Sequence, residues 1–183
     1  MSCEITAIAQ DNSVHCIVKR PRWQRVYDYY KELADGYTTG ELFQSIFENP
    51  DPNVFNNSCA TRVSLGLLNA GKADVGRAFL VQKGPFKGKK ITTSAQGLMT
   101  LLLKEWGKPE VQFTVTKDVT TLKDLKVRIG DKTGVYGLWS NDTRWASGHI
   151  TLWNHNDVVH GAKYTNDAYA GAVSGTVYFW ELK

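Results

Sequence analysis

Residues 56–71, NNSCATRVSLGLLNAG, carry a helical pattern in this sequence of 183 residues. Cys59, Val63 and Leu67 are spaced four residues apart, which places them on one face of a helix. The helix is expected to begin just before Cys59 and to end at Gly71, because glycine readily adopts the conformation that follows a helix C-terminus. The cysteine then lies in the first turn, on the face that points to the core.

Three further helices are expected, two before this segment and one after it. The first spans about residues 21–34 and has large apolar and aromatic residues on one face. The second follows a capping box formed by Thr38 and Glu41. The last of the three follows the Cys59 helix and begins at Thr93, where Gln96 completes another capping box.

After Pro109 the pattern changes from helical to alternating. Short alternating or apolar segments predict six strands, at residues 111–115, 125–129, 133–139, 149–154, 157–160 and 176–182. Helices first and strands second indicate an α+β fold in which N-terminal helices pack on an antiparallel β-sheet. Because no Pro-, Gly- or Ser-rich linker divides the chain, residues 1–183 are expected to form a single domain.

The charge of the chain argues against a nucleic-acid partner. The formal net charge is +4, and lysine and arginine are scattered apart from a short run at residues 83–90. A nucleic-acid-binding protein would normally carry a denser basic patch or a recognisable module. A modest positive charge does suit work near an anionic polymer.

The N-terminal residues, MSCEITAIAQDNS, lack the basic region and the apolar run of a signal peptide. No segment of the sequence is apolar over the length that crosses a membrane. We therefore expect synthesis in the cytoplasm and no membrane insertion, so that any role outside the cytoplasm would need a separate machine for export.

Cys59 is the candidate nucleophile. A helix N-terminus favours the thiolate over the thiol, and the backbone N–H groups there can stabilise an oxyanion. Cys3 and Cys16 can pair at most with each other, which leaves Cys59 free. The alternative is a buried structural cysteine at the start of a core helix.

His149, in the sequence SGHITLWN, is the candidate general base. It follows a glycine at the start of a predicted strand, so its imidazole is uncrowded. Taken alone, a histidine on an amphipathic strand is more often structural. A cysteine at a helix start followed by a histidine on a sheet strand is, however, the arrangement that a cysteine peptidase needs.

An imidazole base also needs a partner that orients it. If residues 149–154 and 157–160 form a hairpin with an even loop, His160 lies on the same face as His149, since strand side chains alternate. An odd loop would place Asp157 on that face instead. His160 is the preferred third member, and Asp157 stays the alternative.

Asn57 and Trp139 are candidate substrate-binding residues because of their neighbourhoods in the sequence. No metal or other cofactor is expected for thiol chemistry. A zinc site formed by Cys59, His149 and His160 is an alternative, although the separation of these residues follows no compact ligand spacing. A chelator would inhibit a zinc enzyme, whereas iodoacetamide would inhibit a thiol enzyme.

Three blocks of sequence, in their order and spacing, resemble the type VI secretion amidase effectors of family four. The blocks are NNSCATRVSLGLLNAG (56–71), LLLKEWGKPE (101–110) and GLWSNDTRWASGHITLWN (137–154). The first has Arg62 and Ser64 three and five positions after the cysteine, and the last contains a Gly-His-x-x-Leu-Trp motif. The resemblance runs from about residue 20 to the C-terminus.

This resemblance implies a papain-like NlpC/P60 fold and an antibacterial toxin that the type VI secretion machinery delivers into the periplasm of rival bacteria. It also implies cleavage of the γ-D-glutamyl–meso-diaminopimelate bond of peptidoglycan stem peptides, and a cognate immunity protein. By position, the nucleophile is Cys59 and the base is His149. The family has an aspartate eleven residues after its histidine; here that position is His160, and other NlpC/P60-like enzymes use a third histidine there.

Two other functions compete with this interpretation. A housekeeping cell-wall endopeptidase would use the same chemistry, and the missing signal peptide counts against it. A non-catalytic wall-binding module would share the fold, but such a module would be free to lose the cysteine or the histidine, and both are present.

Overall fold

The computed structural model describes residues 3–6, 15–116, 122–142, 147–155, 157–159 and 174–183. Its helices are α1 (Trp23–Gly36), α2 (Thr39–Ile46), α3 (Cys59–Asn69), α4 (Ala95–Trp106) and α5 (Leu122–Ile129). Its strands are β1 (Cys3–Thr6), β2 (His15–Val18), β3 (Phe79–Leu80), β4 (Lys90–Ile91), β5 (Val111–Val115), β6 (Thr133–Ser140), β7 (Gly148–Asn154), β8 (Asp157–Val159) and β9 (Gly175–Glu181). Among the residues described, no helix is both long enough and apolar enough to span a bilayer.

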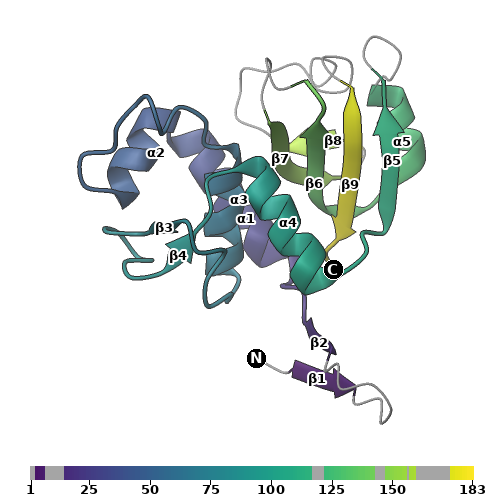
Figure 1. Ribbon diagram of the computed structural model, residues 1–183, viewed down its shortest axis with the longest axis horizontal. Coiled ribbons are helices and arrows are strands. Elements are labelled where there is room, and N and C mark those ends of the chain that lie inside the picture. The colour runs from purple at the N-terminus through teal and green to yellow at the C-terminus, as the bar shows by residue number, and fades with distance from the viewer. Residues whose placement is uncertain (1–2, 7–14, 117–121, 143–146, 156, 160–173) are drawn as a thin grey trace.

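The main sheet is antiparallel, with the strand order β5-β9-β6-β7-β8. Figure 1 shows this sheet on one side of the molecule, with α1, α3 and α4 beside it and α2 with the β3–β4 hairpin farther out. This is the α+β arrangement that the sequence predicts, and all the predicted strands except 125–129 are confirmed.

Alternation along the strands gives the sheet two buried faces. The face toward α1–α4 contributes core residues Val135, Ile150, Leu152 and Trp180. The other face joins Leu125 and Ile129 of α5 in a second core with Tyr136, Leu138, Trp153, Val177 and Phe179. The sheet is therefore the middle layer of the structure, and its central strands carry few polar side chains.

Helix α3 is the most enclosed helix of the structure, since each residue from Ala60 to Leu68 is buried. It packs against α1 and against β7. A Cβ atom at Gly66 would meet the Val26 carbonyl oxygen at 3.1 Å, so the glycine allows α1 and α3 to approach closely. Gly71, with φ of 100°, follows the helix as predicted.

The predicted helix starts are partly confirmed. Thr38 and Glu41 form a reciprocal capping box at α2. The capping box predicted at Thr93 is wrong: Ser94 is the N-cap of α4, and its hydroxyl accepts a hydrogen bond from the Gly97 N–H at 3.2 Å. Two adjacent hydroxyl residues both suit an N-cap, and the structure uses the second.

The strand predicted at residues 125–129 is wrong, because this segment forms α5. Leu125 and Ile129 are buried, whereas Val127 between them is 78% exposed. Positions four apart share a helix face, so the same apolar residues fit a helix that buries only the outer two. Asp124 in the first turn and basic residues in the last turn favour the helix dipole.

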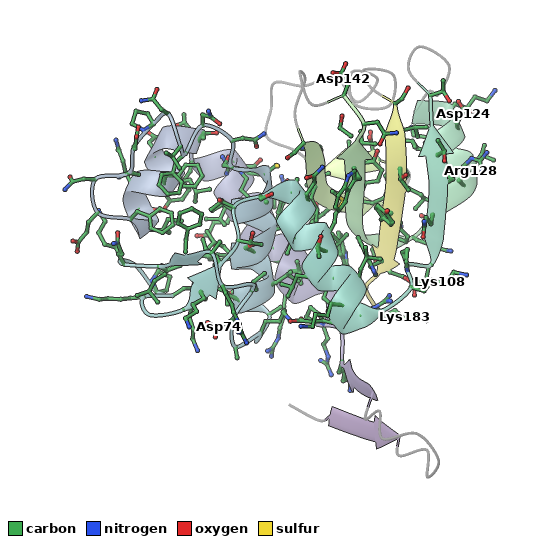
Figure 2. The ribbon with its side chains drawn as sticks, viewed as in Figure 1. Asp74, Lys108, Asp124, Arg128, Asp142 and Lys183 are labelled. Carbon is green, nitrogen blue, oxygen red and sulfur yellow. The ribbon has the colours of Figure 1, made fainter. Side chains whose placement is uncertain are left out.

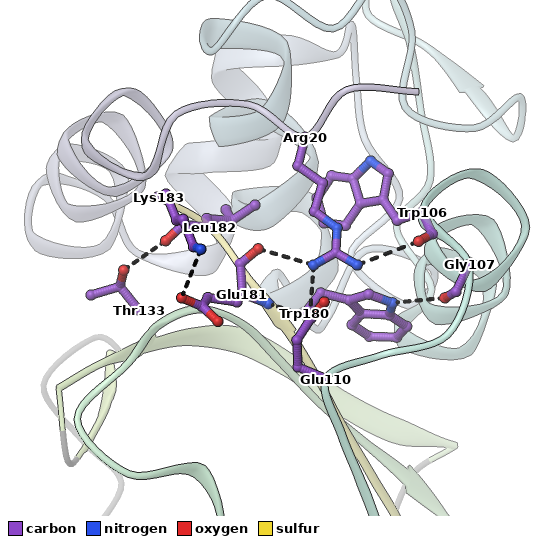
Figure 3. Close-up of polar contacts among 9 residues, drawn as sticks. All are labelled: Arg20, Trp106, Gly107, Glu110, Thr133, Trp180, Glu181, Leu182 and Lys183. Carbon is purple, nitrogen blue, oxygen red and sulfur yellow. Dashed lines mark hydrogen bonds and ion pairs between the residues drawn. The ribbon is translucent and has the colours of Figure 1, made fainter. Parts of the chain in front are cut away.

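A cluster of hydrogen bonds around Arg20 and Glu110, here called the polar clasp, joins the segment before α1 to the C-terminal ends of α4 and β9 (Figure 3). Arg20 donates hydrogen bonds to the Glu110 carboxylate at 2.6 Å, to the Glu181 carbonyl at 3.1 Å and to the Trp106 carbonyl at 3.3 Å. The Glu181 N–H also donates to Glu110, at 2.8 Å. These contacts fix the start of α1 against α4 and β9.

We expect Glu110→Gln to lower the free energy of unfolding by about 1 kcal/mol at neutral pH. Partial burial disfavours the charged carboxylate, but the bonds from Arg20 and from the Glu181 N–H outweigh it, so the pKa of Glu110 is lowered. A lowered folded-state pKa stabilises the protein above the ordinary glutamate pKa, and this contribution is lost as the pH falls through the folded value.

Urea unfolding at several pH values checks this prediction, and the difference between the two proteins should shrink in acid. Asp35→Asn, which breaks the exposed Lys31–Asp35 pair, is the matched control and should change stability little. A pH-independent effect of Glu110→Gln would show that its charge is not what stabilises the clasp.

Candidate active site

Cys59 is the first residue of α3 and its thiol is half-buried. Burial raises the pKa of this thiol, because the charged form loses solvation. The backbone N–H groups of Ile150, Ala60 and Cys59, together with the charge of Arg62, lower the pKa and oppose this effect without cancelling it. The sulfur is therefore surrounded by groups that favour a thiolate, yet it needs a base to take its proton.

The structure brings the cysteine to the start of β7. The Ile150 N–H that bonds the sulfur belongs to the residue directly after His149. His149 is buried and pairs with Leu138 of β6. The predicted nucleophile and the strand that carries the predicted base are thus in contact, although their segments are about ninety residues apart in the sequence.

The hairpin between β7 and β8 has the even loop, with Asn154 paired to Asp157 and Leu152 to Val159. Asp157 therefore lies on the face opposite to that of His149, and the odd register that would bring it alongside the imidazole is absent. His160, the preferred third member, lies outside the described residues. Its role stays a prediction.

Asn57 and Trp139 both border the site. Asn57 is exposed, and its side-chain oxygen accepts a hydrogen bond from the Cys59 N–H at 3.0 Å. Trp139 is half-buried against the helix-side core and pairs with Gly148, one residue before the predicted base. Their contact with a substrate remains untested, but Asn57 has a clear local role in capping α3.

Sequence reasoning gave no role to Tyr30, which proves to be part of the site. Its hydroxyl lies 2.7 Å from the Thr151 hydroxyl and donates to the Val159 carbonyl at 3.0 Å. Burial raises the pKa of Tyr30 to about 12, so the phenol is neutral at physiological pH. In the sequence, Tyr30 is one of the aromatic residues on the apolar face of the helix predicted at residues 21–34, and nothing there indicates that it reaches the β7–β8 hairpin.

Arg62 also lies in the site and was noticed in the sequence only as part of a motif. It is 8% exposed and electrostatically coupled to Cys59. An arginine among the apolar residues of a predicted core helix was the signal in the sequence that could have identified it.

In the part of the chain that the structure describes, no group of three His, Cys, Asp or Glu side chains could hold a metal ion.

Fold and site together define a class: α+β proteins with a free cysteine at the N-terminus of a buried helix, packed against a histidine-bearing strand of an antiparallel sheet. Residues 55–180, more than half of the sequence, match the family described as type VI secretion system (T6SS), amidase effector protein 4. The chain belongs to this family. Comparison with curated proteins gives no match.

Solved structures of this family share the fold. A chain of the Tae4–Tai4 effector–immunity complex from Enterobacter cloacae matches with a TM-score of 0.67 at 20% identity, over 90% of this chain and 100% of its own. The effector Tae4 from the same organism matches with a TM-score of 0.65 at 21% sequence identity, and the match covers 90% of this chain and 98% of that effector chain. A chain of the Tae4–Tai4 complex from Salmonella Typhimurium matches with a TM-score of 0.67 at 19% sequence identity, and the match covers 90% of this chain and 100% of that chain. At such identities the likeness establishes the fold alone.

We expect Asn57→Ala to lower the free energy of unfolding by about 1 kcal/mol, because it leaves the Cys59 N–H without its side-chain acceptor. Urea denaturation of the purified variant measures this effect. Asn56→Ala is the matched control, since the adjacent amide only donates to the exposed Asn53 carbonyl. Equal effects of the two substitutions would contradict a capping role for Asn57.

Proposed function

We propose that this protein is an antibacterial amidase that hydrolyses peptidoglycan stem peptides, with Cys59 as nucleophile and His149 as general base. One observation carries the proposal: within an amidase effector family, the only cysteine of the matched region begins a buried helix and contacts the strand that carries His149. We further propose that the fold is the papain-like NlpC/P60 fold, since a cysteine at the start of a buried helix packed on an antiparallel sheet is its hallmark.

The proposed bond is the amide between the γ-carboxyl of D-glutamate and meso-diaminopimelate. His149 takes the proton of the Cys59 thiol, and the sulfur attacks the γ-glutamyl carbonyl carbon. The resulting imidazolium gives its proton to the departing amine, which leaves a thioester on Cys59. Water, deprotonated by the same imidazole, hydrolyses this thioester and restores the thiol.

The raised pKa of Cys59 supports the need for a base at the moment of attack. Stabilisation of the tetrahedral oxyanion is proposed to come from backbone N–H groups at the N-terminus of α3. Asn57 and Trp139 are proposed to contact the stem peptide, because Asn57 bonds the Cys59 N–H and Trp139 pairs with Gly148, the residue before His149. No step requires a metal ion.

The proposed partners follow from the family. The solved complexes pair Tae4 with the immunity protein Tai4, and we propose that a cognate immunity protein likewise blocks this site. The type VI secretion machinery is proposed to deliver the protein into the periplasm of target bacteria, where peptidoglycan is accessible.

Cys59→Ala is expected to remain folded and to lose peptidoglycan hydrolysis, because no other group can form the acyl-enzyme. The measurement is release of soluble fragments from purified peptidoglycan by the two proteins. Cys3→Ala and Cys16→Ala are the matched controls and should retain nearly full activity. Substantial hydrolysis by Cys59→Ala would overturn the proposed nucleophile.

The same variants test the proposed location. Wild-type protein fused to a periplasmic export signal should lyse the producing cell, whereas the chain without this signal should be tolerated. Exported Cys59→Ala should be harmless. Equal toxicity in both compartments would point to a target other than the cell wall.

His160→Ala is expected to lower kcat by about 10²-fold or more, with little loss of stability. The even hairpin register supports this, because continuing it by one residue would pair His160 with Thr151, on the face of His149. Asp157→Ala is the matched control on the opposite face and should be milder. Steady-state kinetics decide the matter: a crippled Asp157→Ala beside a nearly normal His160→Ala would show that the third member is assigned wrongly.

A further inference from the structure

Arg62 is a charged side chain in the interior of the helical layer. It lies three residues after Cys59 on α3, and it is 8% exposed. The charged residues labelled in Figure 2, by contrast, lie on the periphery of the molecule. A buried guanidinium costs solvation energy, so its position calls for a physical reason.

Two of the acceptors that satisfy Arg62 belong to the C-terminal end of α1. The guanidinium donates to the Leu33 carbonyl and, at 2.8 Å, to the Tyr37 carbonyl. Carbonyl groups at this end of a helix lack intrahelical partners and form the negative pole of the helix dipole. Arg62 therefore joins the negative end of α1 to the positive end of α3, where the cysteine lies.

The third acceptor is the Ser58 hydroxyl, 3.2 Å from Arg62 Nε. Ser58 occupies the N-cap position of α3, yet its side chain accepts no backbone N–H of the helix. The hydroxyl lies between Arg62 and the Thr39 hydroxyl, which is 3.0 Å away. A serine N-cap ordinarily binds the second or third N–H of its helix, which here would be that of Ala60 or Thr61.

The Ala60 N–H instead favours the charged form of the Cys59 sulfur and lowers the pKa of the thiol. By holding the Ser58 hydroxyl away from the helix end, Arg62 leaves this N–H to the nucleophile. Within the described part of the chain, none of the ion pairs includes Arg62. All of its hydrogen-bond acceptors there are neutral, so its positive charge is not cancelled by a carboxylate and acts on the nearby sulfur.

We propose that Arg62 is a positioning residue for the nucleophile: it diverts the Ser58 hydroxyl from the N-terminus of α3 and supplies a fixed positive charge behind the Cys59 thiolate. The proposal rests on the proposed function only in calling Cys59 the nucleophile. Its physical content concerns the ionisation of one thiol, which can be measured without a substrate.

The groups that act on the Cys59 thiol can be separated by their titration. Tyr30 of α1 is neutral up to a pKa of about 12. On α3, burial lowers the pKa of Arg62, while Tyr30 and Cys59 raise it; arginine nevertheless keeps its proton in this range. On β7, His149 is the residue before Ile150, whose N–H lowers the pKa of the thiol. Of Tyr30, Arg62 and the thiol, only the thiol therefore changes charge in a mildly acid to mildly alkaline experiment.

The test is the rate of Cys59 alkylation by iodoacetamide as a function of pH, in a Cys3→Ala, Cys16→Ala background where only this thiol reports. Arg62→Gln, which is neutral but can still donate to a carbonyl, should shift the alkylation midpoint upward by about one pH unit. Arg62→Lys keeps the charge and should shift it much less. Arg20→Met, which removes a structural arginine far from the thiol, is the matched control and should leave it unchanged.

A purely structural role would lower the free energy of unfolding without moving the alkylation profile, and an unmoved profile in folded Arg62→Gln overturns the proposal. Equal shifts in Arg62→Gln and Arg62→Lys also overturn it, because the charge would then be irrelevant. If Arg62→Gln does not fold, Arg62→Met at reduced temperature replaces it under the same criteria. Hydrolysis that survives Cys59→Ala would overturn the proposed nucleophile while leaving the alkylation result intact.

Discussion

The burial of α3 between α1 and β7 is the constraint on which the rest of the structure depends. Each residue of this helix from Ala60 to Leu68 is buried, and its packing against α1 and β7 sets the position of its first residue beside the sheet. Gly66 brings α1 close on one side, and the Ile150 N–H reaches the Cys59 sulfur on the other. Packing that stabilises the fold thereby also sets the geometry of the thiol.

This arrangement places opposing electrostatic effects on one sulfur atom. Burial favours the neutral thiol, whereas backbone N–H groups and Arg62 favour the thiolate. Burial is the larger effect, so the pKa of the thiol is raised and the proton stays on the sulfur at neutral pH. Arg62 takes part in both roles, since the same guanidinium that ties α1 to α3 also frees the Ala60 N–H for the sulfur.

The sequence predicts those features that depend on periodicity and local chemistry. The spacing of Cys59, Val63 and Leu67 located α3, and alternation located β6, β7 and β9. The prediction from periodicity is wrong at residues 125–129. Leu125 and Ile129 fit a strand and a helix equally well until the exposure of Val127, which lies between them, is known. Contacts between distant segments, such as those of Tyr30 with the β7–β8 hairpin, have no local signature.

The central claim is that Cys59 serves an amidase that cuts peptidoglycan stem peptides. Mass spectrometry of purified peptidoglycan after digestion tests it most directly, because the mass of each fragment identifies the bond that was broken. An amidase of this specificity would release fragments that end in D-glutamate together with peptides that begin with diaminopimelate, and Cys59→Ala would release neither. Intact stem peptides after treatment with folded wild-type protein, or cleavage within the sugar backbone, would contradict it.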